Sequence, residues 1–167
     1  MKKLILLFIF IFIPNILYAG SIKAIGVKGN EKDIDRVITV LMYDNYFEPN
    51  QIKIKKNETI KFLVKNKGEL VHEFNIATKA MHLKHQTEMM EMVENGIILG
   101  DKIDKIKMKE IAKKNPSMGH SHSNSVLLSP GESAELIWKF NNTLDIEAAC
   151  NVPGHYEVGM ITKIDNI

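Results

Sequence analysis

The sequence predicts an all-β Greek-key sandwich that is interrupted once by a helical insertion. Short segments in which apolar and polar residues alternate recur over residues 36–76 and 126–164, whereas residues 77–123 show helical spacing. About seven or eight short strands in a chain of this length are typical of a β-sandwich. We therefore expect a single domain over residues 20–167, with residues 77–123 as its insertion.

The N-terminal segment has the pattern of a secretory signal peptide. Two lysines precede an unbroken apolar run over residues 4–13, and Ala19 offers a small residue for cleavage. The run is shorter than the roughly 20 apolar residues that a membrane-spanning helix needs. We expect residues 1–19 to be removed on export to the periplasm, and an uncleaved anchor is the alternative.

The charge of the mature chain is balanced. Removal of residues 1–19 takes two of the 22 basic residues and none of the 20 acidic ones, and leaves 148 of the 167 residues. Such a balance favours neither nucleic acid nor an anionic membrane as a partner. We expect a monomer that contacts no nucleic acid and, once cleaved, no membrane.

Alternation predicts the strands before the insertion. The segment RVITVLMY (36–43) is rich in β-branched and aromatic residues. Residues 51–55 and 59–65 alternate on either side of a turn at 56–58, which predicts two half-buried antiparallel strands. The next strand is expected to turn four residues towards the core: Leu70, His72, Phe74 and Ile76.

Helical spacing predicts two helices in the insertion. The first ends at Asn95-Gly96 and has one face made of residues spaced four, four and three apart: Met81, His85, Met89 and Met92. The second is expected to be capped by Asp101 and to run to about Lys114, with three residues on its apolar side: Ile103, Ile106 and Ile111. The segment MGHSHSNS (118–125) is then a small polar loop.

The β pattern returns at Val126. A strand near 133–140 should place Trp138 in the core, and a strand that ends at Cys150 should turn that cysteine inward. The final strand is expected at about 159–164.

The only cysteine lies in CNVPGHYEVGM (150–160), where it cannot pair within the chain. Alternation turns both His72 and Cys150 inward, and a buried imidazole needs partners. With His155 and Met160 from the same loop, the chain offers two imidazoles, a thiolate and a thioether, which is the donor set of a blue-copper site. A core histidine and an inert buried thiol are the alternatives.

These segments resemble the cupredoxins across nearly all of the mature chain. FEPNQIKIKKNETIKFLVKNKG (47–68) is similar to their early strands, VHEF (71–74) to the strand of the first histidine, and residues 150–160 to their C-terminal ligand loop. The resemblance implies a cupredoxin-like Greek-key β-sandwich with one mononuclear type 1 copper, capable of one-electron transfer. It also implies the copper ligands: His72, Cys150, His155 and Met160.

The insertion resembles that of periplasmic cupredoxins associated with copper tolerance, which carry Met- and His-rich segments. Thioethers and imidazoles suit copper. A second, weaker copper site therefore has five candidate ligands: His82, His85, Met89, His120 and His122. The alternative is a methionine stripe that packs in the core beside a flexible loop.

We expect a periplasmic copper-handling protein whose partners are copper ions and a redox partner protein. The Cys-to-His spacing is similar to that of multicopper oxidases, but Ala149 and Asn151 stand where those enzymes have histidines. We therefore expect no enzyme. The alternatives are a dedicated soluble electron carrier, a cuprous oxidase and a zinc site made by the cysteine and two histidines. Glu73, next to the first histidine, is expected to be solvated.

Overall fold

A computed structural model of the protein describes residues 25–141 and 144–167, so the predicted signal peptide lies outside the described residues. The strands form two five-stranded sheets. The first sheet holds, in spatial order, β1 (Val27–Lys28), β8 (Ser133–Lys139), β5 (Thr59–Asn66), β2 (Arg36–Tyr43) and β3 (Tyr46–Glu48). The second holds β4 (Gln51–Ile54), β10 (Ile161–Asn166), β9 (Ile146–Ala149), β6 (His72–Ala77) and β7 (Ser125–Leu128). The predicted β-sandwich with a helical insertion is confirmed.

The two sheets enclose one apolar core. Most neighbouring strands of the described chain are antiparallel, and two of its pairs, β2–β5 and β4–β10, run parallel. Aromatic rings meet between the layers, where Phe62 of one sheet lies 5.4 Å from Phe74 of the other, centroid to centroid. Trp138 is fully buried in this core, as predicted, and its indole N–H donates to the carbonyl of Ile25.

The strands on either side of the turn at 56–58 are not the antiparallel pair that the alternation suggests. That prediction is wrong, because β4 pairs with β10 in one sheet and β5 pairs with β2 and β8 in the other. The turn is real, and Asn57 has a left-handed φ of 67° in it. It carries the chain across the edge of the sandwich. Both strands turn apolar residues towards the same core from opposite sides, so their alternation is the same in either arrangement.

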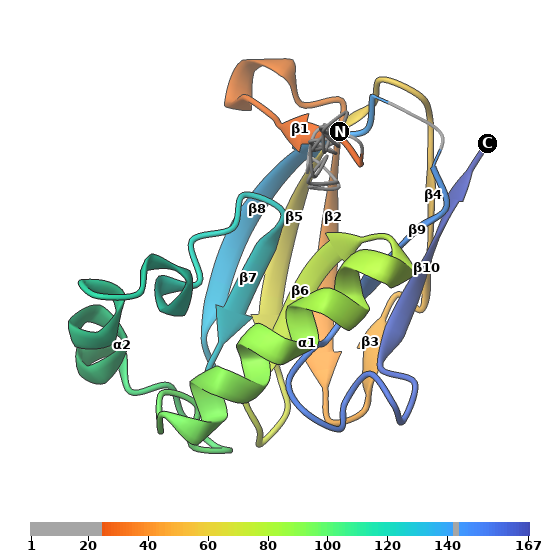
Figure 1. Cartoon of the computed structure of the whole chain (residues 1–167). Coiled ribbons are helices and arrows are strands. Elements are labelled where there is room, and N and C mark those ends of the chain that lie inside the picture. The colour runs from red at the N-terminus through yellow and green to blue at the C-terminus, as the bar shows by residue number, and fades with distance from the viewer. Residues whose placement is uncertain (1–24, 142–143) are drawn as a thin grey trace, which may run out of the picture.

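The insertion joins β6 to β7, as predicted, and contains two α-helices. Helix α1 (Lys79–Glu94) lies across the sheet that holds β6, and α2 (Lys105–Ala112) projects beyond the sheet edge (Figure 1). Thr78 caps α1 by accepting from the N–H of Met81, and the helix ends at Asn95 as expected. Short 3-10 turns, η2 (Glu31–Asp33) and η3 (Pro116–Gly119), complete the elements.

The second helix begins later than predicted. Asp104, not Asp101, is its N-cap, and its carboxylate accepts from the N–H groups of Ile106 and Lys107. Residues 98 and 103 pair in an isolated β-bridge, which keeps the chain extended, so the helix can begin only after Asp104. Ile106, expected on the apolar side, is 75% exposed because α2 stands away from the sandwich.

Helix α1 buries its predicted face against the sheet. Met89 and Met92 lie in the core, and Met118 of η3 joins them. Because α1 covers the outer side of β6, every residue of that strand is buried, on both of its faces. Leu70 was predicted to point inward with His72, but it precedes the strand and is 39% exposed.

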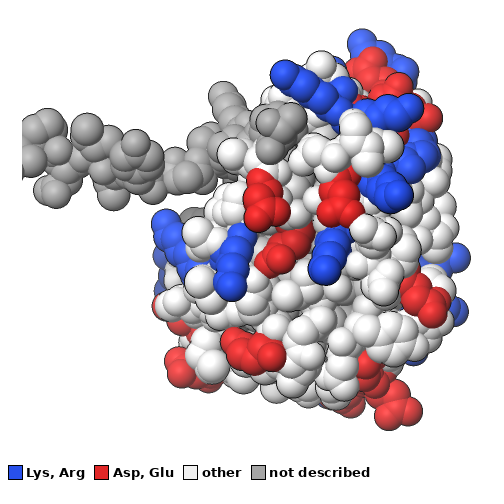
Figure 2. Space-filling view, turned by 90° about the vertical axis from the view of Figure 1, so that its right-hand side faces the viewer, with Lys and Arg blue, Asp and Glu red and all other residues white. Residues whose placement is uncertain are grey.

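Acidic and basic side chains intermix on the face of the molecule shown in Figure 2, in agreement with the balanced composition. Among the described residues, no helix has the length and apolar character needed to cross a membrane.

Candidate metal centre

Two neighbouring strands bring the first histidine and the cysteine together. His72 begins β6, and Cys150 directly follows β9, which pairs with β6. Both side chains are fully buried at the same end of the sandwich. The N–H of Glu73 points at Cys150 Sγ from 3.3 Å, so the sulfur already has one hydrogen-bond donor from the adjacent strand.

His155 completes a group of three convergent donors. Its Nδ1 lies 3.2 Å from Nδ1 of His72 and 3.3 Å from Cys150 Sγ, and the sulfur lies 3.9 Å from His72 Nδ1. These three donor atoms could hold one metal ion between them. His155 is only partly buried, so the group lies just beneath the surface.

The loop from Cys150 to Met160 is closed on itself by backbone hydrogen bonds. The N–H of Cys150 donates to the carbonyl of Met160 over 3.2 Å, and the N–H of Met160 donates to that of His155 over 3.0 Å. Gly154 and Gly159 have φ near 90°, which a side chain would strain. Met160 is fully buried, and the backbone hydrogen bond from Cys150 to its carbonyl places it next to the cysteine.

Asp44 fixes the orientation of the first histidine, and sequence reasoning missed it. Its Oδ1 lies 2.8 Å from His72 Nε2, which leaves Nδ1 facing the cysteine. A carboxylate that holds the far nitrogen of a ligating imidazole fixes both ring and tautomer. Gly68 makes this contact possible, because a Cβ there would lie 2.8 Å from His72 Nε2. Asp44 stands 28 residues before His72, and no local pattern connects the two.

The two imidazoles are already in the protonation state that metal binding needs, whereas the thiol is not. Burial lowers the pKa of His72, against the opposing effect of Asp44, and burial together with the neighbouring His72 lowers the pKa of His155. Both rings are therefore neutral near pH 7, as ligands must be. Burial raises the pKa of the Cys150 thiol to about 12. This thiol is thus inert by itself, and it becomes a thiolate only when a cation displaces its proton.

The donor set also fits copper chemically. Imidazole accepts both Cu(I) and Cu(II), and the thiol and thioether sulfurs are soft donors. A rigid β-scaffold holds the donors in the arrangement described above.

Glu73 is not solvated, and that prediction is wrong. Its side chain is fully buried, because α1 and the loop after η3 cover the outer face of β6. Its Oε1 contacts four donors and its Oε2 contacts the backbone and side-chain N–H groups of Asn151, the residue after the cysteine. The four groups around Oε1 are His85 Nε2 (3.0 Å), His120 Nε2 (2.8 Å), Ser125 Oγ (2.6 Å) and Asn75 Nδ2 (3.1 Å). Glu73 therefore connects the cysteine centre with the histidines of the insertion.

The pKa of Glu73 results from two opposing effects. Burial alone would raise it, but the hydrogen bonds and charges of His120 and His85 outweigh burial and hold the pKa well below its usual value. In the metal-free protein His85 has the opposite shift. Burial would lower its pKa, and the carboxylates of Glu73 and Glu88 raise it to about 10.

Acid should therefore destabilise the metal-free protein through Glu73. Its contribution to the free energy of unfolding is present above the unfolded pKa, near 4.5, and is lost as the pH falls through the lower folded pKa. Urea denaturation at several pH values between 7 and 3 measures this effect. We expect the free energy of unfolding to fall more steeply with decreasing pH in the wild type than in Glu73→Gln. Parallel pH profiles would contradict this.

The structure brings together three of the five candidate ligands of the second site. His85, His120 and His122 converge so that one donor atom from each lies within 4.8 Å of the others. His82 lies elsewhere, fully buried, with its Nδ1 3.1 Å from the side-chain oxygen of Asn151. Met89 packs in the core.

Comparison with known families agrees with this architecture. The family model described as "cupredoxin-like domain" matches residues 7–101, a span that includes His72 and ends before the cysteine loop. The copper-resistant cuproprotein CopI of Pseudomonas aeruginosa is 38% identical over 148 residues, which cover 85% of this chain and 82% of that protein. The CopI protein of Rubrivivax gelatinosus is 30% identical over 140 residues, covering 83% and 71% of the two chains.

Solved structures of blue copper proteins share the fold. Auracyanin B superposes with a TM-score of 0.59 at 14% identity, over 85% of this chain and 96% of its own. Auracyanin A of Chloroflexus aurantiacus, described as a "blue" copper protein, gives 0.51 at 13% identity, over 78% and 99%.

Proposed function

The chain belongs to the cupredoxin-like domain family, and from this premise we propose that it is a periplasmic copper-binding protein that serves copper tolerance. It holds one mononuclear type 1 copper through His72, Cys150 and His155, with Met160 as the axial ligand. The observation that carries the proposal is the convergence of two neutral imidazoles and one buried thiol within 3.9 Å of one another. The names of the CopI relatives support the role in copper tolerance.

The residues around the centre determine how it would work. Bound copper would supply a one-electron couple between Cu(I) and Cu(II). Asp44 holds His72 in the tautomer whose Nδ1 lone pair faces the cysteine. The N–H of Glu73 contacts Sγ and withdraws charge from a thiolate at Cys150. The closed loop keeps His155 in place, so that little has to move when an electron is exchanged.

A dedicated electron carrier is the second candidate, and one observation favours it. His155 is the only partly buried member of the donor group, and Val158, three residues later in the same loop, is exposed. A redox partner protein could exchange electrons at this edge.

We propose no catalytic role. The neighbours of Cys150 are Ala149 and Asn151, both buried, and Asn151 uses its amide to hold Glu73 and His82. Cuprous oxidase chemistry of the multicopper type would need metal-binding histidines at those two positions. Export through the leader at residues 1–19 gives the periplasmic location, and we propose a monomer.

Growth under copper stress tests the proposed role. A strain that lacks the gene should regain growth at high copper when it expresses the wild type, and should fail to regain it with Cys150→Ser, because the serine hydroxyl cannot replace the thiolate. The measurement is the inhibitory copper concentration, with equal protein levels confirmed by immunoblot. Full rescue of growth at high copper by Cys150→Ser would contradict the proposal. A deletion that leaves copper tolerance intact but slows respiration would establish the electron carrier instead.

A further inference from the structure

The insertion holds a second group of convergent donors, distinct from the cysteine centre. We propose that His85, His120 and His122 form a binding site for a Cu(II) ion, with the carboxylate of Glu73 as a fourth donor. This site goes beyond the proposed type 1 centre and shares no ligand with it.

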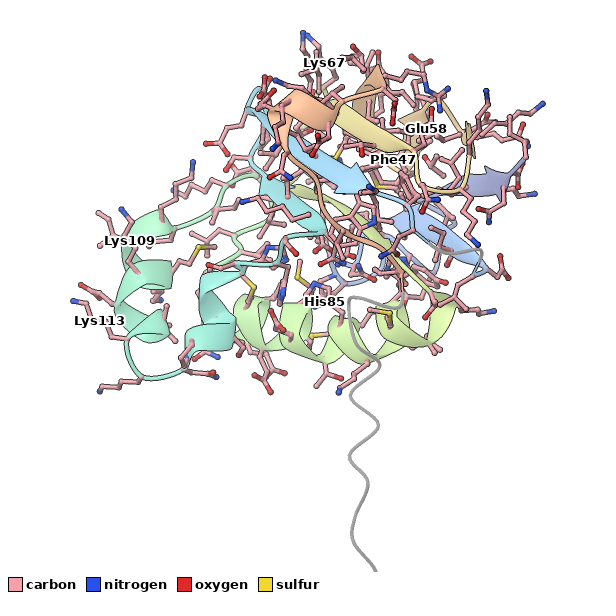
Figure 3. All side chains as sticks on the ribbon, turned by 90° about the horizontal axis from the view of Figure 1, so that it is seen from above. Phe47, Glu58, Lys67, His85, Lys109 and Lys113 are labelled. Atoms are coloured by element: carbon pink, nitrogen blue, oxygen red, sulfur yellow. The ribbon has the colours of Figure 1, made fainter. Side chains whose placement is uncertain are left out.

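The three histidines come from two segments, helix α1 and the loop after η3, which pack against each other. His85 projects from α1 towards the sheet (Figure 3), while His120 and His122 follow η3. The ring centroids form a triangle of 5.0, 5.1 and 5.4 Å. His120 has a left-handed φ of 47°, an unfavourable conformation for a residue with a side chain, and the fold retains it where it turns that ring inward.

Each histidine of the cluster has a carboxylate partner, but one oxygen of Glu73 is crowded with donors. Oε1 of Glu73 has four donors within 3.1 Å, although a carboxylate oxygen offers only about two lone pairs. Two of those donors are the imidazoles of His85 and His120. A metal ion bound between the rings would relieve this crowding, since it would take the imidazole nitrogens as ligands and the carboxylate oxygen as a further one.

The surroundings of the cluster favour a cation with a bound water. Glu73 is fully buried, and Glu88 contacts His122 Nε2 at 2.9 Å, so two carboxylates face the rings. A cavity of about 100 Å³ is lined by His85, His122 and Asn124 among others, which is room for a water. Oδ1 of Asn124 is buried and has no hydrogen-bond partner among the described residues. It is an unused acceptor beside the cavity, suited to a water on the metal.

The donors select the metal. Three imidazoles and a carboxylate are borderline and hard ligands, without the sulfur that favours Cu(I). For divalent ions bound by such ligands, affinity rises to a maximum at Cu(II) and falls again at Zn(II). The site is therefore one for Cu(II) with nitrogen and oxygen ligands.

Titration of the mature protein with Cu(II) beyond one equivalent tests the site. We expect a second equivalent to bind with an ordinary Cu(II) EPR spectrum, split by nitrogen ligands, while the thiolate absorption band stays constant. His120→Ala and His122→Ala should weaken this second equivalent at least about tenfold, the smallest loss seen even when an outer partner of a ligand is removed. Calorimetry gives the affinity, and circular dichroism verifies the fold.

Two choices keep the test decisive. His120 contacts buried Glu73, so its replacement could unfold the protein, whereas the His122 side chain is 29% exposed and its variant should fold. His82→Gln is the matched control. His82 lies on α1 like His85 but contacts Asn151 instead of the cluster, so this variant should still bind the second equivalent of Cu(II). Saturation at one equivalent, or equal second-site affinity in His122→Ala, would overturn the proposal. Displacement of the second ion by equimolar Zn²⁺ would overturn its assignment to copper.

The outcome is independent of the type 1 centre. Failure of that centre appears as a missing thiolate band, whereas failure of the second site appears only as a missing second equivalent.

Discussion

Replacing Cys150 with serine should abolish the intense visible absorption of the copper-loaded protein. That band is expected to arise from charge transfer between the Cys150 thiolate and Cu(II), and the chain has no other cysteine to supply it. A serine hydroxyl would remain protonated in this buried site, where even the thiol has a pKa of about 12. Optical and EPR spectra of both proteins, recorded during titration with one equivalent of Cu(II), measure the effect.

A methionine elsewhere in the core provides the control. Met89 is as fully buried as Met160 but lies on α1 and not in the loop of residues 150–160, so Met89→Leu should keep the band unchanged. A band that survives in Cys150→Ser, or that is absent from the wild type, would refute the type 1 assignment. In the second case the protein would be a cupredoxin-like domain with an inert buried thiol.

Removing the carboxylate of Glu73 should destabilise the metal-free protein by about 3–5 kcal/mol, the usual cost of removing one partner from a buried ion pair. Glu73→Ala would remove the buried acceptor to which five residues now donate: His85, His120, Ser125, Asn75 and Asn151. Urea denaturation at pH 7 measures the change in unfolding free energy.

Glu88→Ala is the matched control for that prediction. Glu88 also contacts two histidines of the cluster, but its side chain is 19% exposed, so water can replace it. Glu88→Ala should therefore reduce the free energy of unfolding clearly less than Glu73→Ala does. If Glu73→Ala were as stable as the wild type, the buried carboxylate would not hold the insertion against the sheet, and its contacts would contribute little to the fold.

Most of the sandwich could be predicted from the sequence because strand signals are local. Alternation identified β5, β8 and β9 and turned His72 and Cys150 inward, since side-chain direction follows from the period of two residues, and β-branched and aromatic residues identified β2. The same signal could not assign β4 and β5 to their sheets. Pairing partners lie far apart in the chain, and alternation is identical whichever sheet a strand joins.

The errors at the helix cap and at Glu73 have a related cause. Asp101 and Asp104 are both able to cap a helix, and only the bridge between Ile98 and Ile103 decides between them. Glu73 alternates with core residues, so it reads as solvent-facing. Glu73 is nevertheless buried, because helix α1 covers the outer face of β6. The only hint in the sequence was that a long insertion follows that strand directly.

The sequence by itself determined the kinds of candidate ligand, their order and the strands and loop that carry them, because these are properties of neighbouring residues. Only the tertiary structure decided which distant side chains meet. It brought Asp44 to His72, buried Glu73 behind Cys150, and gathered His85 with His120 and His122 while it sent His82 to Asn151. Such contacts depend on how helices and loops pack across a sheet, and no local sequence pattern records that packing for residues that are 28 or more positions apart.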